Sequence, residues 1–176
     1  ARRALEALLV AMDRYRAYVV PGRPVDAEQV AVIEGAAERA RTRVAPSDVV
    51  ALGVIVDLVL GRELRGAALD AAALADDFRV RFQQTCGPVM AKGIEDTAYY
   101  RWLRLAGANE VGGHPDHLSI SPAEFHAWCE RLVTTWPTSM TTLTTHDTKR
   151  SEDVRARLMP LAEDGEGWAT WVEQAR

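Results

Sequence analysis

Apolar residues recur at intervals of three and four along most of the chain, a spacing that predicts α-helices. The first predicted helix continues to Val19 and ends at Pro21-Gly22. A second begins after Asp26, an N-cap residue that has Gln29 three positions later in a capping-box arrangement. The expected buried face of this second helix consists of Val30, Ile33, Ala37, Ala40 and Val44. The chain is therefore expected to be mainly α-helical.

Glycine and proline divide the middle of the chain into three more predicted helices. The most apolar run, from Val49 to Leu60, should end at Gly61. A fourth helix is expected from about Ala71 to Thr85, where Gly87-Pro88 should interrupt it. A fifth helix, with aromatic residues along one side, is expected near Val89 to Leu105.

The clearest helix signal follows an irregular loop, Gly107 to His117, that holds three glycines and a proline. Ser121 is an N-cap, Pro122 occupies the first helical position, and Glu124 completes a capping box. Pro137 ends this helix. Its apolar stripe consists of Phe125, Trp128, Cys129, Leu132, Val133 and Trp136.

The run from Met140 to Thr145 predicts a β-strand, because threonine is β-branched and no helix cap precedes the run. His146-Asp147 follows directly, and Ser151 is expected to begin a further helix with Glu152 and Asp153 in its first turn. A lone strand cannot satisfy its own backbone hydrogen-bonding groups. We therefore expect the partner strands of this run to lie outside the sequence.

Composition limits the class of protein. With 48% hydrophobic residues the 176-residue chain can form a core, and its net charge of −4 argues against a nucleic-acid partner. Two distant cysteines favour reduced thiols in a cytoplasmic protein. No signal-peptide pattern is present, and no apolar run is long enough to span a bilayer, so we expect no membrane partner. The chain begins without methionine and stops in a charged helix-like run, so we expect an excised segment.

His146-Asp147 allows two interpretations. Barrel enzymes place functional residues at the C-terminal tips of strands, which favours a functional role for this pair. Alternatively, Asp147 or Ser151 is a helix cap, and the pairs Glu152–Arg155 and Asp153–Arg157 are surface ion pairs at helical spacing. The surface-pair interpretation is favoured for the charged residues after Ser151, but it leaves His146-Asp147 unexplained.

A second candidate cluster lies on the fifth predicted helix. On an α-helix, Lys92, Glu95, Asp96 and Tyr99 share one face, which gathers a cation, two carboxylates and a phenol. A solvated face with a Lys–Asp pair is the more common outcome of such a pattern. Gly93 in this helix costs roughly 1 kcal/mol relative to alanine, a cost that close approach of a ligand or backbone would justify.

Three histidines and a cysteine raise the question of a zinc site. His114 and His117 are spaced as metal ligands can be, with His126 and Cys129 further on. Turn formation explains the first two equally well, and Cys129 belongs to an apolar helix stripe. We therefore expect no metal here.

Three segments in the same order resemble maltooligosyltrehalose synthases, which are α-glucan glucosylmutases of the α-amylase clan. They are "RFQQTCGPVMAKGIEDTAYYRWLRL", "NEVGG" and "TTHDTKRSEDVRARL", and the earlier "YRAYV" fits the same family. The resemblance implies a helical insertion of an α-amylase-type (β/α)8 barrel, followed by one late barrel strand with its loop and helix. Residues 1–136 would be the insertion, and residues 137–176 the late strand, catalytic loop and following helices.

The resemblance also implies a reaction and a set of residues. The family converts the reducing-end α-1,4 bond of a maltooligosaccharide into an α,α-1,1 bond through a covalent glycosyl-enzyme, without a cofactor. Asp147 matches the aspartate that stabilises the transition state, and His146 matches the sugar-binding histidine beside it. Lys92 and Lys149 match a pocket that holds the released glucose. Further expected lining residues are Glu95, Asp96, Asn109, Glu110 and Arg150.

The sequence departs from the family pattern in one decisive respect. The nucleophile and acid/base motifs of the clan are absent, so the chain alone should be inactive and should need the remainder of the catalytic domain as a partner. Cys86 and His114 also differ from the expected residues. Two alternatives stay open: a non-catalytic helical module that binds a glycan or a protein, and a hydrolase of the same clan.

Overall fold

A computed structural model describes residues 1–62, 71–102 and 106–176. These residues form helices and loops, and no β-strand occurs among them. The chain divides into two compact units, an N-terminal unit (Ala1–Ile94) and a C-terminal unit (Glu95–Arg176), which we describe separately. The expected division between residues 136 and 137 concerns a larger parent protein and stays a prediction.

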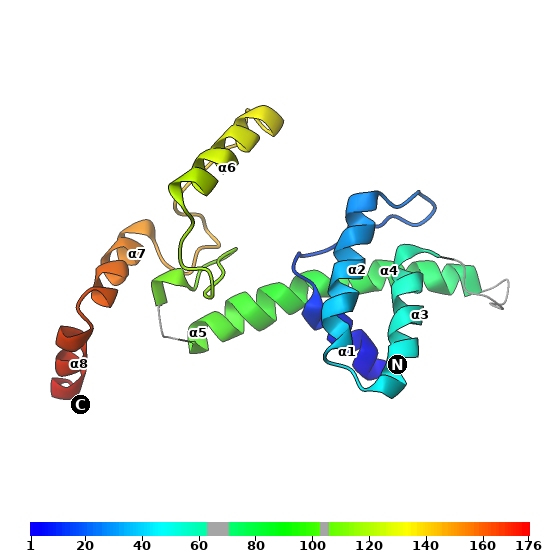
Figure 1. Cartoon of the computed structure of the whole chain (residues 1–176), viewed down its shortest axis with the longest axis horizontal. Helices are drawn as coiled ribbons and strands as arrows, with labels where there is room; N and C mark the ends of the chain where they lie inside the picture. Colours follow the sequence, from blue (N-terminus) through cyan, green and yellow to red (C-terminus); the bar gives the residue numbers. More distant parts are fainter. Residues whose placement is uncertain (63–70, 103–105) are drawn as a thin grey trace. The chain divides into compact units, whose positions relative to one another are not determined.

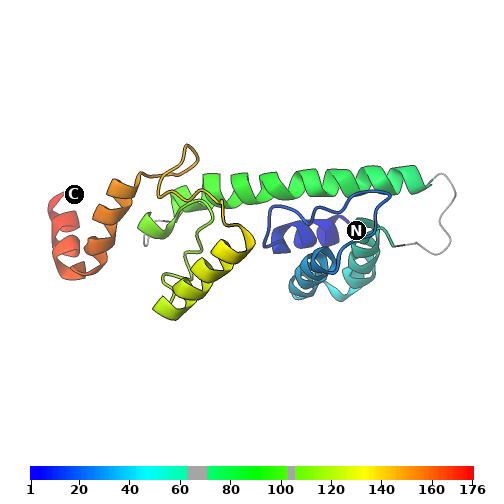
Figure 2. The same ribbon diagram turned by 90° about the horizontal axis from the view of Figure 1, so that it is seen from above.

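Four α-helices form the N-terminal unit (Figure 1): α1 (Arg2–Ala11), α2 (Ala27–Arg41), α3 (Val49–Leu60) and α4 (Ala71–Pro88). A single 3-10 turn, η1 (Pro46–Asp48), precedes α3. The first three helices pack against one another, and Figure 2 shows them on the same side of α4. One continuous core therefore lies among these four helices.

Small and branched aliphatic side chains fill this core. Ala36 and Ala40 of α2 are fully buried together with Ile33, and alanine lets helix axes approach closely. The predicted inner face of α2 is confirmed for Ile33, Ala37 and Ala40, whereas Val30 and Val44 are only partly buried at its margin. The other side chains that are at most 1% exposed are Ala4, Leu8, Ala17, Leu52, Val59 and Cys86.

The first predicted helix is shorter than expected: α1 ends at Ala11, not at Val19. The following segment is extended, with Ala17 and Val19 buried and Tyr18 exposed at a φ of 53°. A long-range contact holds this extended segment in place. The buried amide of Gln83 accepts from the backbone N–H of Val19 at 2.9 Å and donates to its carbonyl at 2.6 Å. Gln83 thus satisfies the backbone of Val19 as a neighbouring strand would.

Other predicted boundaries in this unit met different outcomes. Gly61 ends α3 in a left-handed conformation with φ 70°, as predicted. Asp26 stands at the N-cap of α2, but its side chain accepts no hydrogen bond there, so the expected capping box is wrong.

Gly87-Pro88 does not interrupt the fourth helix, because α4 includes both residues. A π-helix, η2 (Val89–Ala98), and then α5 (Tyr99–Arg101) follow directly. Proline lacks the N–H that an α-helix needs, and a π-helical stretch is one way in which a helix absorbs such a break. The last three residues of the fifth predicted helix, 103–105, lie outside the described residues.

The C-terminal unit contains η3 (Ala106–Ala108), α6 (Pro122–Thr135), α7 (Glu152–Leu158), η4 (Met159–Ala162) and α8 (Gly165–Gln174). Helix α7 packs against η3 and η4, and α8 packs against η4. This unit has few buried side chains, and those it has lie near η3 and the end of η2.

Helix α6 begins as predicted but does not bury its apolar stripe. Ser121 Oγ accepts from the N–H of Glu124 at 3.2 Å, and the Glu124 carboxylate accepts from the N–H of Ser121 at 2.7 Å, which confirms the capping box. Trp128 is 43% exposed and Trp136 is 68% exposed. The stripe therefore has the expected spacing without covering a core within this unit.

The predicted strand from Met140 to Thr145 is absent from the structure. Local side-chain bonds replace a sheet: the Thr142 hydroxyl donates to the carbonyl of Thr144 at 2.9 Å. The Thr144 hydroxyl in turn accepts from the N–H of Glu152 at 3.0 Å. The β propensity of threonine has no effect here because no described segment pairs with this run.

Among the described residues, no helix combines the length and the apolar character needed to cross a membrane.

Replacement of Gln83 with alanine should destabilise the chain. The change leaves the buried N–H and carbonyl of Val19 without partners, which costs about 2–4 kcal/mol in the free energy of unfolding. Urea denaturation followed by circular dichroism measures the change. Gln84→Ala is the matched control, because Gln84 is exposed on the same helix. Equal effects of the two substitutions would show that the contact is not important.

Candidate functional site

His146 and Asp147 form the tip of a tight turn. The N–H and the hydroxyl of Thr148 both donate to the carbonyl of Thr145, at 3.3 and 2.7 Å. The N–H of Asp147 donates to the hydroxyl of Thr145 at 3.2 Å. The side chains of His146 and Asp147 are 91% and 70% exposed, with 3.5 Å between Nε2 and Oδ2. The turn therefore presents an imidazole and a carboxylate side by side to solvent.

The helix-cap alternative is confirmed for the position of Ser151 but not for Asp147. Ser151, not Asp147, stands at the N-cap of α7, and its side chain makes no cap hydrogen bond. The hydroxyl of Thr144 receives the first-turn N–H of Glu152 instead. The carboxylate of Asp147 therefore caps no helix and lies beside the imidazole of His146.

The predicted surface pair Glu152–Arg155 is replaced by other contacts. The Glu152 carboxylate accepts from the hydroxyl of Thr144. Arg155 donates to the carbonyl of Leu143 and has Nη1 at 3.8 Å from Oε2 of Glu110. Arg155 therefore faces the loop before α7 rather than its own helix.

Asn109 closes the end of α5. Its side-chain Nδ2 donates to the carbonyl of Tyr99 at 3.2 Å and also to the carbonyl of Trp102. These are carbonyls that a helix end leaves without intrahelical partners. Asn109 is 1% exposed, so its amide serves the backbone and not the solvent.

Two glycines shape the loop after Asn109. Gly112 has φ 72°, a left-handed conformation that glycine adopts without strain. A Cβ atom on Gly113 would lie 2.9 Å from the carbonyl oxygens of Ala108 and Glu110. The carbonyl of Gly113 accepts from the hydroxyl of Tyr99 at 2.5 Å. The segment "NEVGG" is therefore a compact turn fastened to α5.

Glu110 binds the backbone on the far side of the Asp147 turn. Its Oε1 accepts from the N–H of Lys149 at 2.5 Å and from that of Val111 at 2.9 Å. Its Oε2 accepts from the N–H of Arg150 at 3.1 Å. Burial alone would raise the pKa of Glu110, but these backbone hydrogen bonds and the charge of Arg155 outweigh it and lower that pKa. The carboxylate is therefore ionised at neutral pH.

Lys149 is held by its side chain as well. Its ammonium donates to the carboxylate of Asp96 and lies 5.6 Å from the ring centroid of Tyr100. The Lys149 side chain is only 10% exposed. The hydrogen bond to Asp96 raises the pKa of Lys149. Next to it, the guanidinium of Arg150 donates to the carbonyl of Asn109 at 3.4 Å.

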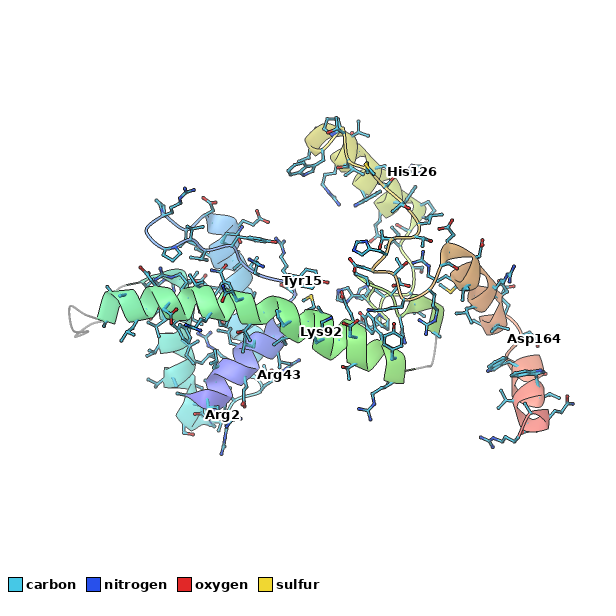
Figure 3. All side chains as sticks on the ribbon, turned by 180° about the vertical axis from the view of Figure 1, so that it is seen from behind. Arg2, Tyr15, Arg43, Lys92, His126 and Asp164 are labelled. Atoms are coloured by element: carbon cyan, nitrogen blue, oxygen red, sulfur yellow. The ribbon has the colours of Figure 1, made fainter. Side chains whose placement is uncertain are left out.

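The structure thus brings together most of the predicted site residues. Glu95 also joins, because its Oε1 accepts from the N–H of Gly112 at 3.4 Å. Lys92 is exposed on η2 (Figure 3) and belongs to the N-terminal unit, so the structure does not place it in this cluster. The clustered members are Glu95, Asp96, Asn109, Glu110, Lys149 and Arg150.

The predicted face of Lys92, Glu95, Asp96 and Tyr99 assumed an α-helix. Residues Val89–Ala98 form a π-helix, whose wider turns change which residues share a face. A Cβ atom on Gly93 would meet nothing within 4 Å, so no described part of the protein explains this glycine by close approach. Sequence reasoning also missed the roles of Tyr100 and Arg155, because both depend on residues more than 40 positions away.

The histidines of the zinc hypothesis do not form a metal-binding group. Within the described ranges, no cluster of three His, Cys, Asp or Glu side chains could hold a metal ion. His114 Nδ1 lies 3.6 Å from Asp116 Oδ1 and its ring meets that of His117 edge-on. His126 projects from α6 (Figure 3) and packs edge-on against Phe125.

The chain is similar to two curated proteins of Mycobacterium tuberculosis, from strains CDC 1551 / Oshkosh and ATCC 25618 / H37Rv. Both are named "Putative maltooligosyl trehalose synthase". Each is 48% identical over 113 residues, which is 63% of this chain and 15% of the relative. The chain thus matches only a small part of their length. No family model and no solved structure matches it. The resemblance to maltooligosyltrehalose synthases is confirmed.

Replacement of Gly113 with alanine should destabilise the C-terminal unit. The new methyl group would press on two backbone oxygens that cannot move independently, at a cost of about 1–3 kcal/mol. Tryptophan fluorescence during urea denaturation reports the effect, because all five tryptophans lie after residue 101. Gly165→Ala is the control, since a Cβ atom there meets nothing within 4 Å. An unchanged Gly113→Ala midpoint would contradict the close approach.

Proposed function

We propose that this chain is one part of a maltooligosyltrehalose synthase and that it contributes the carboxylate of Asp147 to the active site. The proposal rests on the exposure and surroundings of this side chain. It is exposed at a turn, adjacent to His146, while the residues just after it are anchored. The similarity over 113 residues supplies the enzyme class.

The proposed reaction is a double displacement. The parent enzyme would break the reducing-end α-1,4 bond and release one glucose while an aspartate binds the remaining glycosyl chain covalently. It would then transfer that chain to the anomeric hydroxyl of the released glucose. A glutamate would protonate the leaving oxygen and later deprotonate the attacking hydroxyl. Both residues would come from the remainder of the catalytic domain, because this sequence lacks their motifs.

Asp147 would act on the sugar ring during both displacements. A carboxylate that accepts hydrogen bonds from sugar hydroxyls stabilises the oxocarbenium-like transition state more than the ground state, because those bonds strengthen as positive charge develops on the ring. The imidazole of His146, 3.5 Å away, would bind a neighbouring hydroxyl. The turn would therefore present the Asp147 carboxylate and the His146 imidazole to the same sugar ring.

The acceptor pocket is the less direct part of the proposal. Lys149 and the adjacent Arg150 would hold the released glucose until its anomeric hydroxyl faces the glycosyl-enzyme. A closed site lined with charged groups favours this transfer over attack by water. The contact of Lys149 with Asp96 supports the proposal, because it fixes the direction of the ammonium group.

Unpaired surfaces support the view that the chain belongs to a larger barrel domain. Met140 and Leu143 are 99% and 72% exposed in a run that would become a strand once neighbouring strands are present. The apolar stripe of α6 and the stacked rings of Trp168 and Trp171 on α8, 5.1 Å apart, would be covered by the same domain.

The isolated chain should not act on maltooligosaccharides. Without a nucleophile and an acid/base, incubation of the purified chain with a maltooligosaccharide should leave the concentration of reducing ends unchanged. A reducing-sugar assay with product chromatography is the measurement. A loss of reducing ends faster than in the sample without enzyme would refute the proposal that the nucleophile and the acid/base come from the remainder of the catalytic domain.

Asp147→Asn should abolish most activity once the missing part is supplied. A chimera in which a segment of this chain that includes Asp147 replaces the corresponding part of a Mycobacterium tuberculosis relative provides it. Loss of a transition-state contact predicts a decrease in kcat of at least about 10²-fold. Asp153→Asn, which removes an equal charge from an exposed position on α7, is the control.

The same chimera separates the alternatives. Free glucose in place of non-reducing trehalose ends would identify a hydrolase. Activity that is insensitive to Asp147→Asn would leave only a structural or binding role for the segment.

A further inference from the structure

We infer that Glu110 is the positioning residue of Asp147: its carboxylate clamps the backbone that directly follows the His146-Asp147 turn. The link to catalysis rests on the function proposed above, whereas the clamp itself does not. This assignment differs from the substrate contact that the sequence suggested for Glu110.

The Glu110 carboxylate accepts three backbone hydrogen bonds inside the protein and also faces a guanidinium group. A carboxylate offers about four lone-pair sites. Oε1 accepts from the N–H groups of Val111 and Lys149, whereas Oε2 accepts from that of Arg150 and faces Arg155 Nη1 at 3.8 Å. Glu110 is also only 8% exposed. Three backbone N–H groups and burial thus direct this carboxylate to the protein's own backbone, and we assign it a positioning role and not a substrate contact.

The clamp is well placed to set the position of the turn. The hydrogen bonds that form the turn are local ones, between Thr145, Asp147 and Thr148. Two residues after Asp147, the backbone N–H of Lys149 donates to the carboxylate of Glu110, which lies 39 residues earlier in the sequence. The ammonium of Lys149 is tied to Asp96, so the same residue is fixed at its backbone and at its side-chain end.

Glutamine cannot perform this function although it has nearly the same shape. A Gln side chain keeps one acceptor oxygen but replaces the other with an NH2 donor. In Glu110→Gln that donor would face either the N–H of Arg150 or the N–H groups of Lys149 and Val111. At least one backbone N–H would lose its partner, and the loop after Asp147 would be released.

Nuclear magnetic resonance on the whole ¹⁵N-labelled 176-residue chain tests the clamp without any activity assay. In Glu110→Gln, amide hydrogen exchange of Lys149 and Arg150 should accelerate at least about tenfold, the factor expected for losing a charge-assisted hydrogen bond. Glu163→Gln, an exposed glutamate of the same unit, is the control and should leave both rates unchanged. Unchanged rates in Glu110→Gln would overturn the inference.

A pH titration of the unmodified chain gives a second test that does not depend on how well the variant folds. Because the pKa of folded Glu110 lies below its ordinary value, the clamp should be intact at neutral pH and lost as the pH falls through that lowered pKa. The amide shifts of Val111, Lys149 and Arg150 should share this midpoint, and those of His146 and Asp147 should follow it. The inference would be overturned if the amides of Val111, Lys149 and Arg150 had different midpoints. It would also be overturned if the amide shifts of His146 and Asp147 did not change with them.

The charged groups around the clamp define one further control. Arg155 faces the Glu110 carboxylate, whereas Asp96 binds the ammonium group of Lys149 and does not contact the amides. Asp96→Asn should therefore retain the shared midpoint of the amides. If the midpoint disappears in Asp96→Asn, then Asp96 and not Glu110 positions the turn.

The two proposals can fail separately. A confirmed clamp together with a fully active Asp147→Asn chimera would remove the proposed function and leave Glu110 as a loop anchor. Loss of activity in that chimera with unchanged amide exchange in Glu110→Gln would leave the function and remove the clamp.

Discussion

One buried carboxylate joins two stretches of the C-terminal unit that are far apart in the sequence. Glu110 accepts hydrogen bonds from backbone N–H groups 39 and 40 residues further along the chain. The glycine turn that carries Glu110 is itself fastened to α5 through Tyr99 and Asn109. The position of the exposed His146-Asp147 tip thus depends on a chain of contacts that begins at a helix end.

Local rules predicted the features that local contacts determine. The capping box of α6 and the glycine that ends α3 follow from residues within one turn, and both are present. The extended segment after α1 is different, because a side chain 64 residues away satisfies the backbone of Val19. The threonine run shows the converse. Its propensity favours a strand, but no described segment offers the hydrogen bonds that a strand needs.

The candidate site was predictable in membership but not in roles. Sequence reasoning and resemblance selected most of the residues that cluster around Glu110, including Asp96, Asn109 and Lys149. Charged and amide side chains look like ligands for a polar substrate when only their types are known. Burial and hydrogen-bond partners show instead that several of them bind the protein itself, while Asp147 remains exposed.

The central claim is that this framework presents Asp147 to a sugar ring. A crystal structure of the chimeric enzyme with a bound maltooligosaccharide tests it most directly. The account predicts a carboxylate oxygen of Asp147 within hydrogen-bonding distance of hydroxyls on the reacting glucosyl unit, with Glu110 still on the amides of Lys149 and Arg150. A bound sugar that lies out of reach of Asp147 would contradict the account.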